Sequence, residues 1–219
     1  MRRFMRYSSL PLARLLAKTP ITPNMVTIFG FSLTIPAFIL LIQGNYVYSI
    51  IGAVLGLVSF YLEYVDGSLA RIKNMGSIYG QFLDMYFGRF GVLLLYLGII
   101  IGAYRANPSL LIIVAGFLAY TAALMNGAMY NSFHRLLLDK AKEVIATEKK
   151  NQSILPNFYY VEVFYYPIIL IAAIAGKLDW FLYFAAVYGW LFTFGTFYIF
   201  GKAIKKEAQR RKVENLPEE

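Results

Sequence analysis

Acidic side chains gather where one long apolar stretch of this chain ends and the next begins. Glu63 and Asp66 stand three residues apart near the end of the first stretch, and Asp84 follows in the second. Residues three apart share one face of a helix, so we expect Glu63 and Asp66 to point the same way. Carboxylates are costly inside a membrane, and several of them in a site of low dielectric constant repel one another unless cations lie between them. This pattern predicts a functional site.

The types of these side chains indicate which cation they would bind. The chain has one histidine and no cysteine, so the cluster offers only oxygen atoms. Oxygen ligands favour Mg²⁺, Mn²⁺ or Ca²⁺ over zinc, and Mg²⁺ is usually held by few protein carboxylates together with substrate phosphates. We therefore expect Glu63, Asp66 and Asp84 to be metal ligands, with one or two Mg²⁺ or Mn²⁺ ions, and the substrate to be phosphorylated.

Small residues and one arginine surround the acids. Gly67, Ala70 and Gly80 would let a ligand approach the backbone closely. Arg71 offers a planar guanidinium that can bind a phosphate through two hydrogen bonds. The alternative is that Gly67 simply ends its helix and Arg71 extends to the membrane surface; the combination favours a phosphate site.

The elements that position these residues are membrane helices. Of the 219 residues, 59% are hydrophobic and only 15% are charged, and the apolar residues come in runs of about twenty, the length of a membrane-spanning helix. The fold class is therefore all-α integral membrane. A short amphipathic helix over residues 10–17 is expected to lie on the membrane surface. Six spans follow, at about residues 25–43, 46–69, 81–104, 109–133, 158–176 and 178–201.

The charges predict how these spans are oriented. Residues 1–24 form an interfacial segment, residues 25–201 the six-helix domain and residues 202–219 a basic tail. Lys and Arg gather on one side of this arrangement, which predicts that both termini and the acidic cluster are cytoplasmic. The net charge of +9 suits anionic lipid headgroups better than nucleic acid.

The acidic stretch resembles a known motif. Asp66-Gly67-Ser68-Leu69-Ala70-Arg71, eight residues, Gly80, three residues and Asp84 match the pattern Asp-Gly-x-x-Ala-Arg, eight residues, Gly-x-x-x-Asp of the CDP-alcohol phosphotransferases. Residues 22–27, Thr-Pro-Asn-Met-Val-Thr, are similar to the start of that family's first span. The resemblance covers about residues 8–200.

The resemblance implies a reaction and roles for residues. A CDP-alcohol gives its phospho-alcohol group to an acceptor hydroxyl and CMP leaves, in the synthesis of phospholipids or related phosphodiesters. The family uses divalent ions and dimerises as a six-helix membrane bundle. By position, Asp66, Gly67, Ala70, Arg71 and Gly80 would bind the nucleotide; Glu63, Asp66 and Asp84 would bind metal; Arg89 and Arg135 are candidates for binding a phosphate of the acceptor.

Two positions depart from the family pattern. Glu63 replaces its first Asp, and Gly88 stands where a fourth acid would bind metal and act as general base. Glycine does neither. The base would then be Glu63, a substrate phosphate, or Asp84, which is our candidate catalytic residue. By this reasoning Gly88→Asp raises CMP release. Two other functions stay open: a catalytically silent relative that binds CDP-lipid or nucleotide, and an ion-coupled transporter that uses the same acids.

Overall fold

The computed structural model describes residues 2–138 and 161–214, and the regular elements in that part of the chain are all helices. Polar caps begin several of them, because Thr22, Asn45 and Ser77 each accept a hydrogen bond from a backbone N–H of the following first turn. The helices are α1 (Arg2–Ala17), α2 (Pro23–Leu41), α3 (Tyr46–Ile72), α4 (Ile78–Ala106), α5 (Leu110–Leu138), α8 (Val161–Ile174) and α9 (Leu178–Glu214).

Five helices in the described residues are long and apolar enough to cross a bilayer. They are Pro23–Leu41, Tyr46–Ile72, Ile78–Ala106, Leu110–Met129 and Leu178–Lys202, and they correspond to five of the six predicted spans. The remaining predicted span, residues 158–176, contains α8, which has 14 residues. Such a helix rises about 21 Å, less than the roughly 30 Å of a hydrocarbon core. The all-helical fold is confirmed, whereas a crossing by the predicted span 158–176, and with it the total of six spans, is not.

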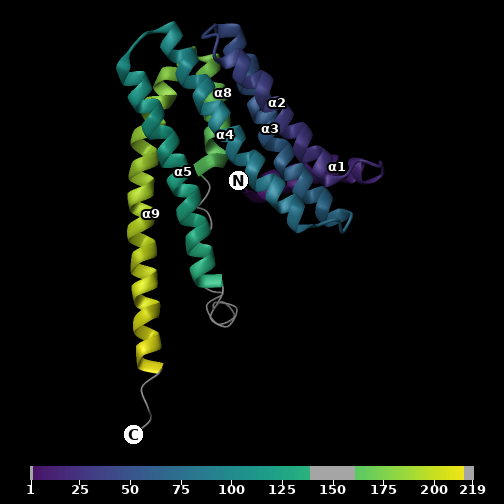
Figure 1. Cartoon of the computed structure of the whole chain (residues 1–219), viewed down its shortest axis with the longest axis vertical. Helices are drawn as coiled ribbons and strands as arrows, with labels where there is room; N and C mark the ends of the chain where they lie inside the picture. Colours follow the sequence, from purple (N-terminus) through teal and green to yellow (C-terminus); the bar gives the residue numbers. More distant parts are fainter. Residues whose placement is uncertain (1, 139–160, 215–219) are drawn as a thin grey trace.

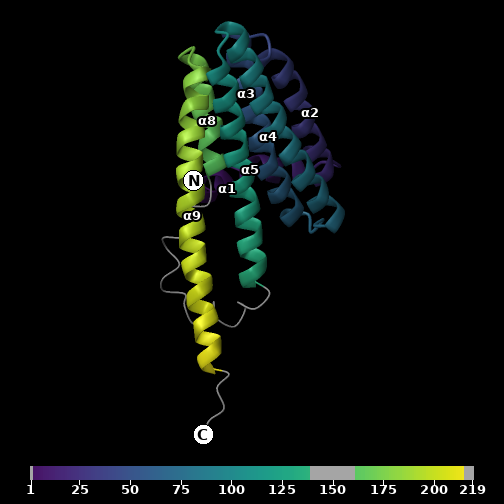
Figure 2. The same ribbon diagram turned by 60° about the vertical axis from the view of Figure 1, so that its left-hand side comes forward.

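The long helices run alternately up and down the molecule. Figures 1 and 2 show the α2–α3, α4–α5 and α8–α9 connections at one end and the α3–α4 connection at the other. At the first end, the Tyr46 hydroxyl donates a 2.8 Å hydrogen bond to the carbonyl of Ile174 and joins α3 to α8. The acidic residues near the end of α3 and the start of α4 therefore meet at the opposite end.

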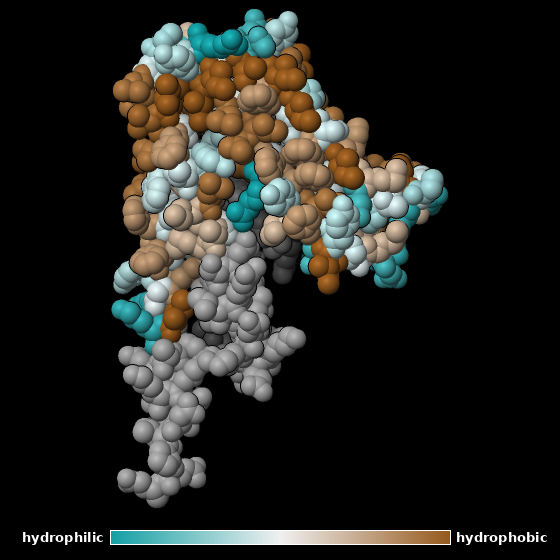
Figure 3. Space-filling view, in the orientation of Figure 1, coloured by the Kyte–Doolittle hydropathy of each residue, from teal (hydrophilic) through white to brown (hydrophobic). Residues whose placement is uncertain are grey.

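The outer surface of these helices is apolar. Only 33% to 39% of the most apolar part of each candidate span is buried inside the molecule, so the rest faces outward. Figure 3 shows apolar side chains gathered below a polar rim at the end that carries the α2–α3 and α4–α5 connections. An apolar surface this extensive fits a surrounding of lipid.

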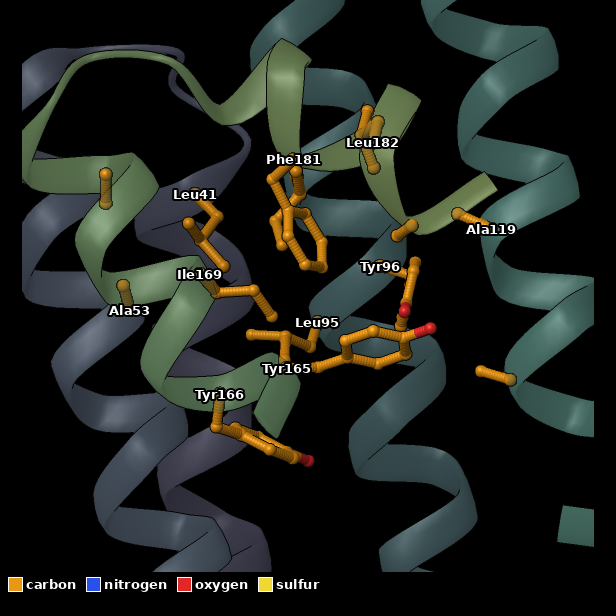
Figure 4. Packing of buried hydrophobic residues seen from close by; sticks show 14 of the residues in the cluster. Leu41, Ala53, Leu95, Tyr96, Ala119, Tyr165, Tyr166, Ile169, Phe181 and Leu182 are labelled. Carbon is orange, nitrogen blue, oxygen red and sulfur yellow. The ribbon is translucent and has the colours of Figure 1, made fainter. Parts of the chain in front are cut away.

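The main core lies between α3, α4, α5, α8 and α9, and Leu41 joins it from the end of α2. Leu41 and Leu182 are fully buried there, and Ile169 nearly so, around the ring of Phe181 (Figure 4). In a bilayer such side chains gain by close packing rather than by leaving water. This core holds together the bundle that carries the acidic residues.

α1 runs across the long helices rather than along them (Figure 1). It begins at Arg2, earlier than the predicted start at residue 10. Its Ser9 hydroxyl lies 3.0 Å from that of Ser68 in a buried hydrogen bond, and the Tyr61 hydroxyl donates to the carbonyl of Ser8 at 2.7 Å. One face of α1 is thus fastened to α3, directly beside the acidic motif.

Candidate functional site

Three chain segments meet at the α3–α4 end of the bundle around a cavity of about 100 Å³. α3 contributes Asp66, Gly67 and Ala70 to its wall, and α4 contributes Gly80 and Asp84. The fold thus brings together five of the residues that the motif predicts. The rest of the wall comes from the start of α2, from the α3–α4 connection and from the first turn of α4: Pro23, Asn24, Thr27, Met75, Gly76, Ser77 and Gln81.

Asp66 is the most deeply placed of the cavity's acids. Only 5% of it is exposed, and its Oδ2 accepts a 2.6 Å hydrogen bond from the Thr27 hydroxyl on α2. A hydrogen bond this short holds the carboxylate in one orientation. Asp84 is exposed on the opposite wall. One acid is therefore fixed by the protein and the other is open to a ligand.

Arg71 lies at the edge of the cavity rather than in its described wall. Its guanidinium donates to the Ser68 hydroxyl at 3.1 Å and passes over Gly67, where a Cβ atom would lie 3.7 Å from one of its nitrogens. Ser68 is the residue that also bonds to Ser9 of α1. The position of the arginine is therefore linked to the packing of α1.

Gly80 lies at a close approach between α4 and α2. A Cβ atom at this position would lie 2.8 Å from Oδ1 of Asn24, a distance that real Cβ atoms do not show. The Gly80 N–H also donates to the Ser77 hydroxyl, which caps α4. The glycine thus lets Asn24 lie against the first turn of α4, on the cavity wall.

The end of α3 lies beyond Gly67. The helix continues to Ile72, so the alternative in which Gly67 ends the helix is wrong. Asn74, at φ 53°, makes the turn, and the N–H groups of Asn74 and Met75 donate to the carbonyls of Arg71 and Ala70. This is a Schellman arrangement with asparagine in the left-handed position.

Lys73 fastens this end of α3 to the connection that leads into α2. Its ammonium group donates to the carbonyls of Thr19 and Ile21, at 2.6 and 2.8 Å. The same connection leads directly to Asn24 and Thr27, so Lys73 helps to set the position of the α2 side of the cavity.

Glu63 and Gly88 lie one helical turn away from the cavity. A Cβ atom built on Gly88 would lie 3.4 Å from Glu63 Oε1 and 4.0 Å from Glu63 Cδ, and no other atom outside the local helix would be within 4 Å. Glu63 is half-buried and is not among the described residues of the cavity wall. Its carboxylate points toward the position where the motif lacks a side chain.

The predicted ligands do not form a ready-made metal cage. Among the described residues, no three Asp, Glu, His or Cys side chains are grouped closely enough to hold an ion. Asp66 and Asp84 share the cavity wall, whereas Glu63 lies outside it. Two carboxylates in an open cavity nevertheless fit Mg²⁺, which takes one or two of them and completes its shell with water and phosphate oxygens.

The two candidate arginines for the acceptor are less well placed. Arg89 is exposed and is not part of the described cavity wall. Arg135 belongs to α5, and its side chain lies outside the described part of the chain. The role of both residues stays a prediction.

A larger cavity, of about 330 Å³, lies at the other end of the bundle. Its wall includes Tyr46, Asn107, Lys177 and Asp179 and contains no residue of the acidic motif. Size alone would select this end, whereas the residues of the acidic motif converge on the smaller cavity.

Asn24 and Thr27 are site residues that the sequence reasoning missed. From the sequence, the stretch 22–27 is predicted only as the start of a helix, and Asn24 and Thr27 have no predicted role in the site. The signal was present: a hydroxyl and an amide stand one helical turn apart at the start of an otherwise apolar span. Only the packing of α2 against α3 and α4 shows that Thr27 faces Asp66 and that Asn24 faces Gly80.

Fold and cavity together define a helical membrane protein with an acidic, phosphate-compatible site at one end of its bundle. The model of the CDP-alcohol phosphatidyltransferase family matches residues 20–204, which include the whole acidic motif, and the chain belongs to this family. The resemblance inferred from the motif is confirmed.

A curated relative is also similar. Archaetidylinositol phosphate synthase from Pyrococcus horikoshii is 35% identical over 95 residues. The match covers 42% of this chain and 49% of the relative, so the chain spans about half the length of that protein.

Proposed function

We propose that this protein transfers the phospho-alcohol group of a CDP-alcohol to an acceptor hydroxyl and releases CMP. The observation that carries the proposal is the convergence of Asp66, Gly67, Ala70, Gly80 and Asp84 on one cavity. The family to which the chain belongs is named for this chemistry, and the five candidate spans support an action on lipid substrates.

In this reaction the acceptor oxygen attacks the phosphorus atom that carries the alcohol. A new oxygen–phosphorus bond forms, the bond from that phosphorus to the bridging oxygen breaks, and CMP leaves with that oxygen. The proton of the acceptor hydroxyl passes to a carboxylate of the protein. We expect the pyrophosphate to enter between α3 and α4, where Asp66, held by Thr27, and the exposed Asp84 line the cavity.

The small residues of the wall would admit the nucleotide, since Gly67 and Gly80 leave the backbone uncovered. Arg71 at the cavity edge would bind a phosphate oxygen. Asp66 and Asp84 would hold one or two Mg²⁺ or Mn²⁺ ions, and Glu63 is the further candidate ligand. Such an ion, when bound, would stabilise charge on the attacking and leaving oxygens.

The acceptor is proposed from the relative's name. That protein is named for making archaetidylinositol phosphate, which suggests an inositol phosphate as acceptor and a CDP-linked lipid as donor. Glycerol phosphate and serine are the other acceptors to compare.

The finer architecture is part of the same proposal. We infer six spans over residues 25–201, with α8 as part of the fifth, both termini and the cavity on the cytoplasmic side, and α1 at the membrane surface. From the family resemblance we further propose that the protein forms a homodimer. The crosswise placement of α1 and the distribution of Lys and Arg support this arrangement.

A second function is favoured by one specific observation. Gly88 leaves the motif without its fourth acid. This absence is what we expect of a family member that binds CDP-lipid or nucleotide but does not turn it over. Loss of a positioned general base typically lowers the rate about 10²- to 10⁴-fold.

CMP release distinguishes the two functions. The full-length protein in liposomes is given CDP-lipids with inositol phosphate, glycerol phosphate or serine, in Mg²⁺, in Mn²⁺ or with a chelator. Metal-dependent CMP release that needs both substrates and is lost in Asp66→Asn supports the transferase. CDP-lipid binding with no CMP release from any combination overturns it in favour of the silent relative.

A further inference from the structure

Glu63 and Gly88 occupy equivalent levels on facing helices. Glu63 precedes Asp66 by three residues on α3, and Gly88 follows Asp84 by four residues on α4. Because the two helices run in opposite directions, both positions lie one turn farther from the α3–α4 connection than the pair Asp66 and Asp84 (Figure 1). The motif therefore has two levels: an Asp pair at the cavity and a Glu–Gly pair behind it.

The Glu63 carboxylate lies close to the space that a side chain at position 88 would fill. Its Oε1 is 3.4 Å from the position of a Gly88 Cβ. In an aspartate, a carboxylate oxygen lies roughly 2.4 Å from its Cβ, given bonds of about 1.5 and 1.2 Å. The Glu63 oxygen is thus only about 1 Å farther from this Cβ position than a carboxylate oxygen of an aspartate at position 88 would be.

The two departures from the family pattern are matched. Glutamate is one methylene longer than the aspartate it replaces, and this extra reach of about 1.5 Å carries its carboxylate across to α4. Glycine leaves that space open. An aspartate at 88 would instead face the Glu63 carboxylate, and two like charges at such short range are unfavourable.

We propose that Glu63 is a catalytic residue, whose carboxylate stands in for the acid missing at position 88 and accepts the proton of the acceptor hydroxyl. This role rests on the proposed transferase function and deepens it. It also reverses the expectation from sequence: Gly88→Asp alone lowers CMP release, because the new carboxylate competes with Glu63.

The decisive experiment is an exchange of the two positions. CMP release is compared in the wild type, Glu63→Asp, Gly88→Asp and the double variant Glu63→Asp/Gly88→Asp. We expect each single change to lower the rate at least tenfold and the double variant to recover to within a few-fold of wild type. Cooperative thermal unfolding, measured in detergent for all four proteins, shows that each is folded.

A stability comparison tests the contact without relying on turnover. Gly88→Asp should lower the melting temperature more than Gly88→Asn, which has nearly the same shape and no charge. In a Glu63→Gln background this difference should disappear. A difference that is absent in the wild-type background, or that persists in Glu63→Gln, overturns the proposed position of the carboxylate.

The outcomes separate the two proposals. If the wild type releases CMP but the double variant is no better than the poorer single variant, or Gly88→Asp matches the wild type, the role of Glu63 is wrong and the transferase stands. If the wild type releases no CMP from any substrate pair, the transferase function fails, and the catalytic role of Glu63 fails with it.

Discussion

Thr27 shows how a residue outside the acidic motif sets the geometry of a residue inside it. Its hydroxyl donates to Asp66 across the α2–α3 contact, and Asp66 is almost fully buried. A buried carboxylate that loses such a donor is left less well solvated and free to turn. The orientation of the main cavity acid therefore depends on α2 as much as on α3.

Thr27→Val should lower CMP release about 10- to 100-fold, because a hydrogen bond to a charged group contributes roughly 1.5–3 kcal/mol. Valine keeps the shape of threonine and removes only the hydroxyl. Thr27→Ser, which retains the hydroxyl, is the matched control and should stay near wild type. Equal rates for the valine and serine variants would contradict the role of the hydrogen bond.

Gly80→Ala should raise the dissociation constant for CDP-lipid about tenfold or more. The added Cβ would lie 2.8 Å from Asn24 Oδ1, so the asparagine side chain must leave its place on the cavity wall. Gly195→Ala, at a helical glycine where a Cβ meets nothing within 4 Å, is the control and should bind normally. Unchanged binding by both variants, measured in the same liposomes, would show that this approach of α2 is not needed.

At the scale of elements, the α3–α4 connection and the end of α3 fix the positions of the helix ends around the cavity. The turn is made by Asn74 in the left-handed region, and Lys73 bonds back to the connection before α2. Two helix ends and a helix start are therefore tied together within a few residues. This arrangement keeps the two sides of the cavity in register although they come from different helices.

Asn74→Ala should lower the free energy of unfolding by about 1 kcal/mol or somewhat more, because the left-handed conformation costs residues with a Cβ about 1–2 kcal/mol. Asparagine tolerates this conformation better than alanine, and Asn74→Gly should be at least as stable as wild type. Thermal unfolding in detergent gives the comparison. Asn107→Ala, at an exposed residue with φ −146°, serves as the control; a loss there as large as in Asn74→Ala would remove the backbone explanation.

The whole molecule has an orientation that labelling can measure, since the chain contains no cysteine. Single cysteines at Lys18, Asn107 and Lys202 place one thiol before α2, one between α4 and α5 and one at the end of the last candidate span. An impermeant maleimide should label Asn107→Cys in intact cells, and the other two only after the membrane is opened.

Labelling of Lys202→Cys also tests the number of membrane crossings. With six crossings, residues 18 and 202 lie on the same side of the membrane, whereas five crossings would place them on opposite sides. Labelling of Lys202→Cys from outside, with Lys18→Cys protected, would therefore contradict the proposed crossing by α8. Labelling of Lys18→Cys from outside would reverse the orientation predicted from the Lys and Arg distribution.

Much of this protein can be predicted from the chain without coordinates. Apolar runs and the acidic motif are local patterns, so five spans, the all-helical fold and the family follow from residues that lie close together in the sequence. The motif also identifies five of the cavity residues, Asp66, Gly67, Ala70, Gly80 and Asp84, because they lie on two consecutive helices joined by a short connection.

Other features depend on how distant segments pack. Thr27 reaches Asp66 across 39 positions of sequence, and Asn24 faces Gly80 only because α2 lies against α4. The sequence makes Gly88 a missing acid, whereas the facing helices bring the Glu63 carboxylate to that position. Spacing along a chain predicts which side chains share one helix face, but contacts between helices depend on their packing, which no local pattern encodes.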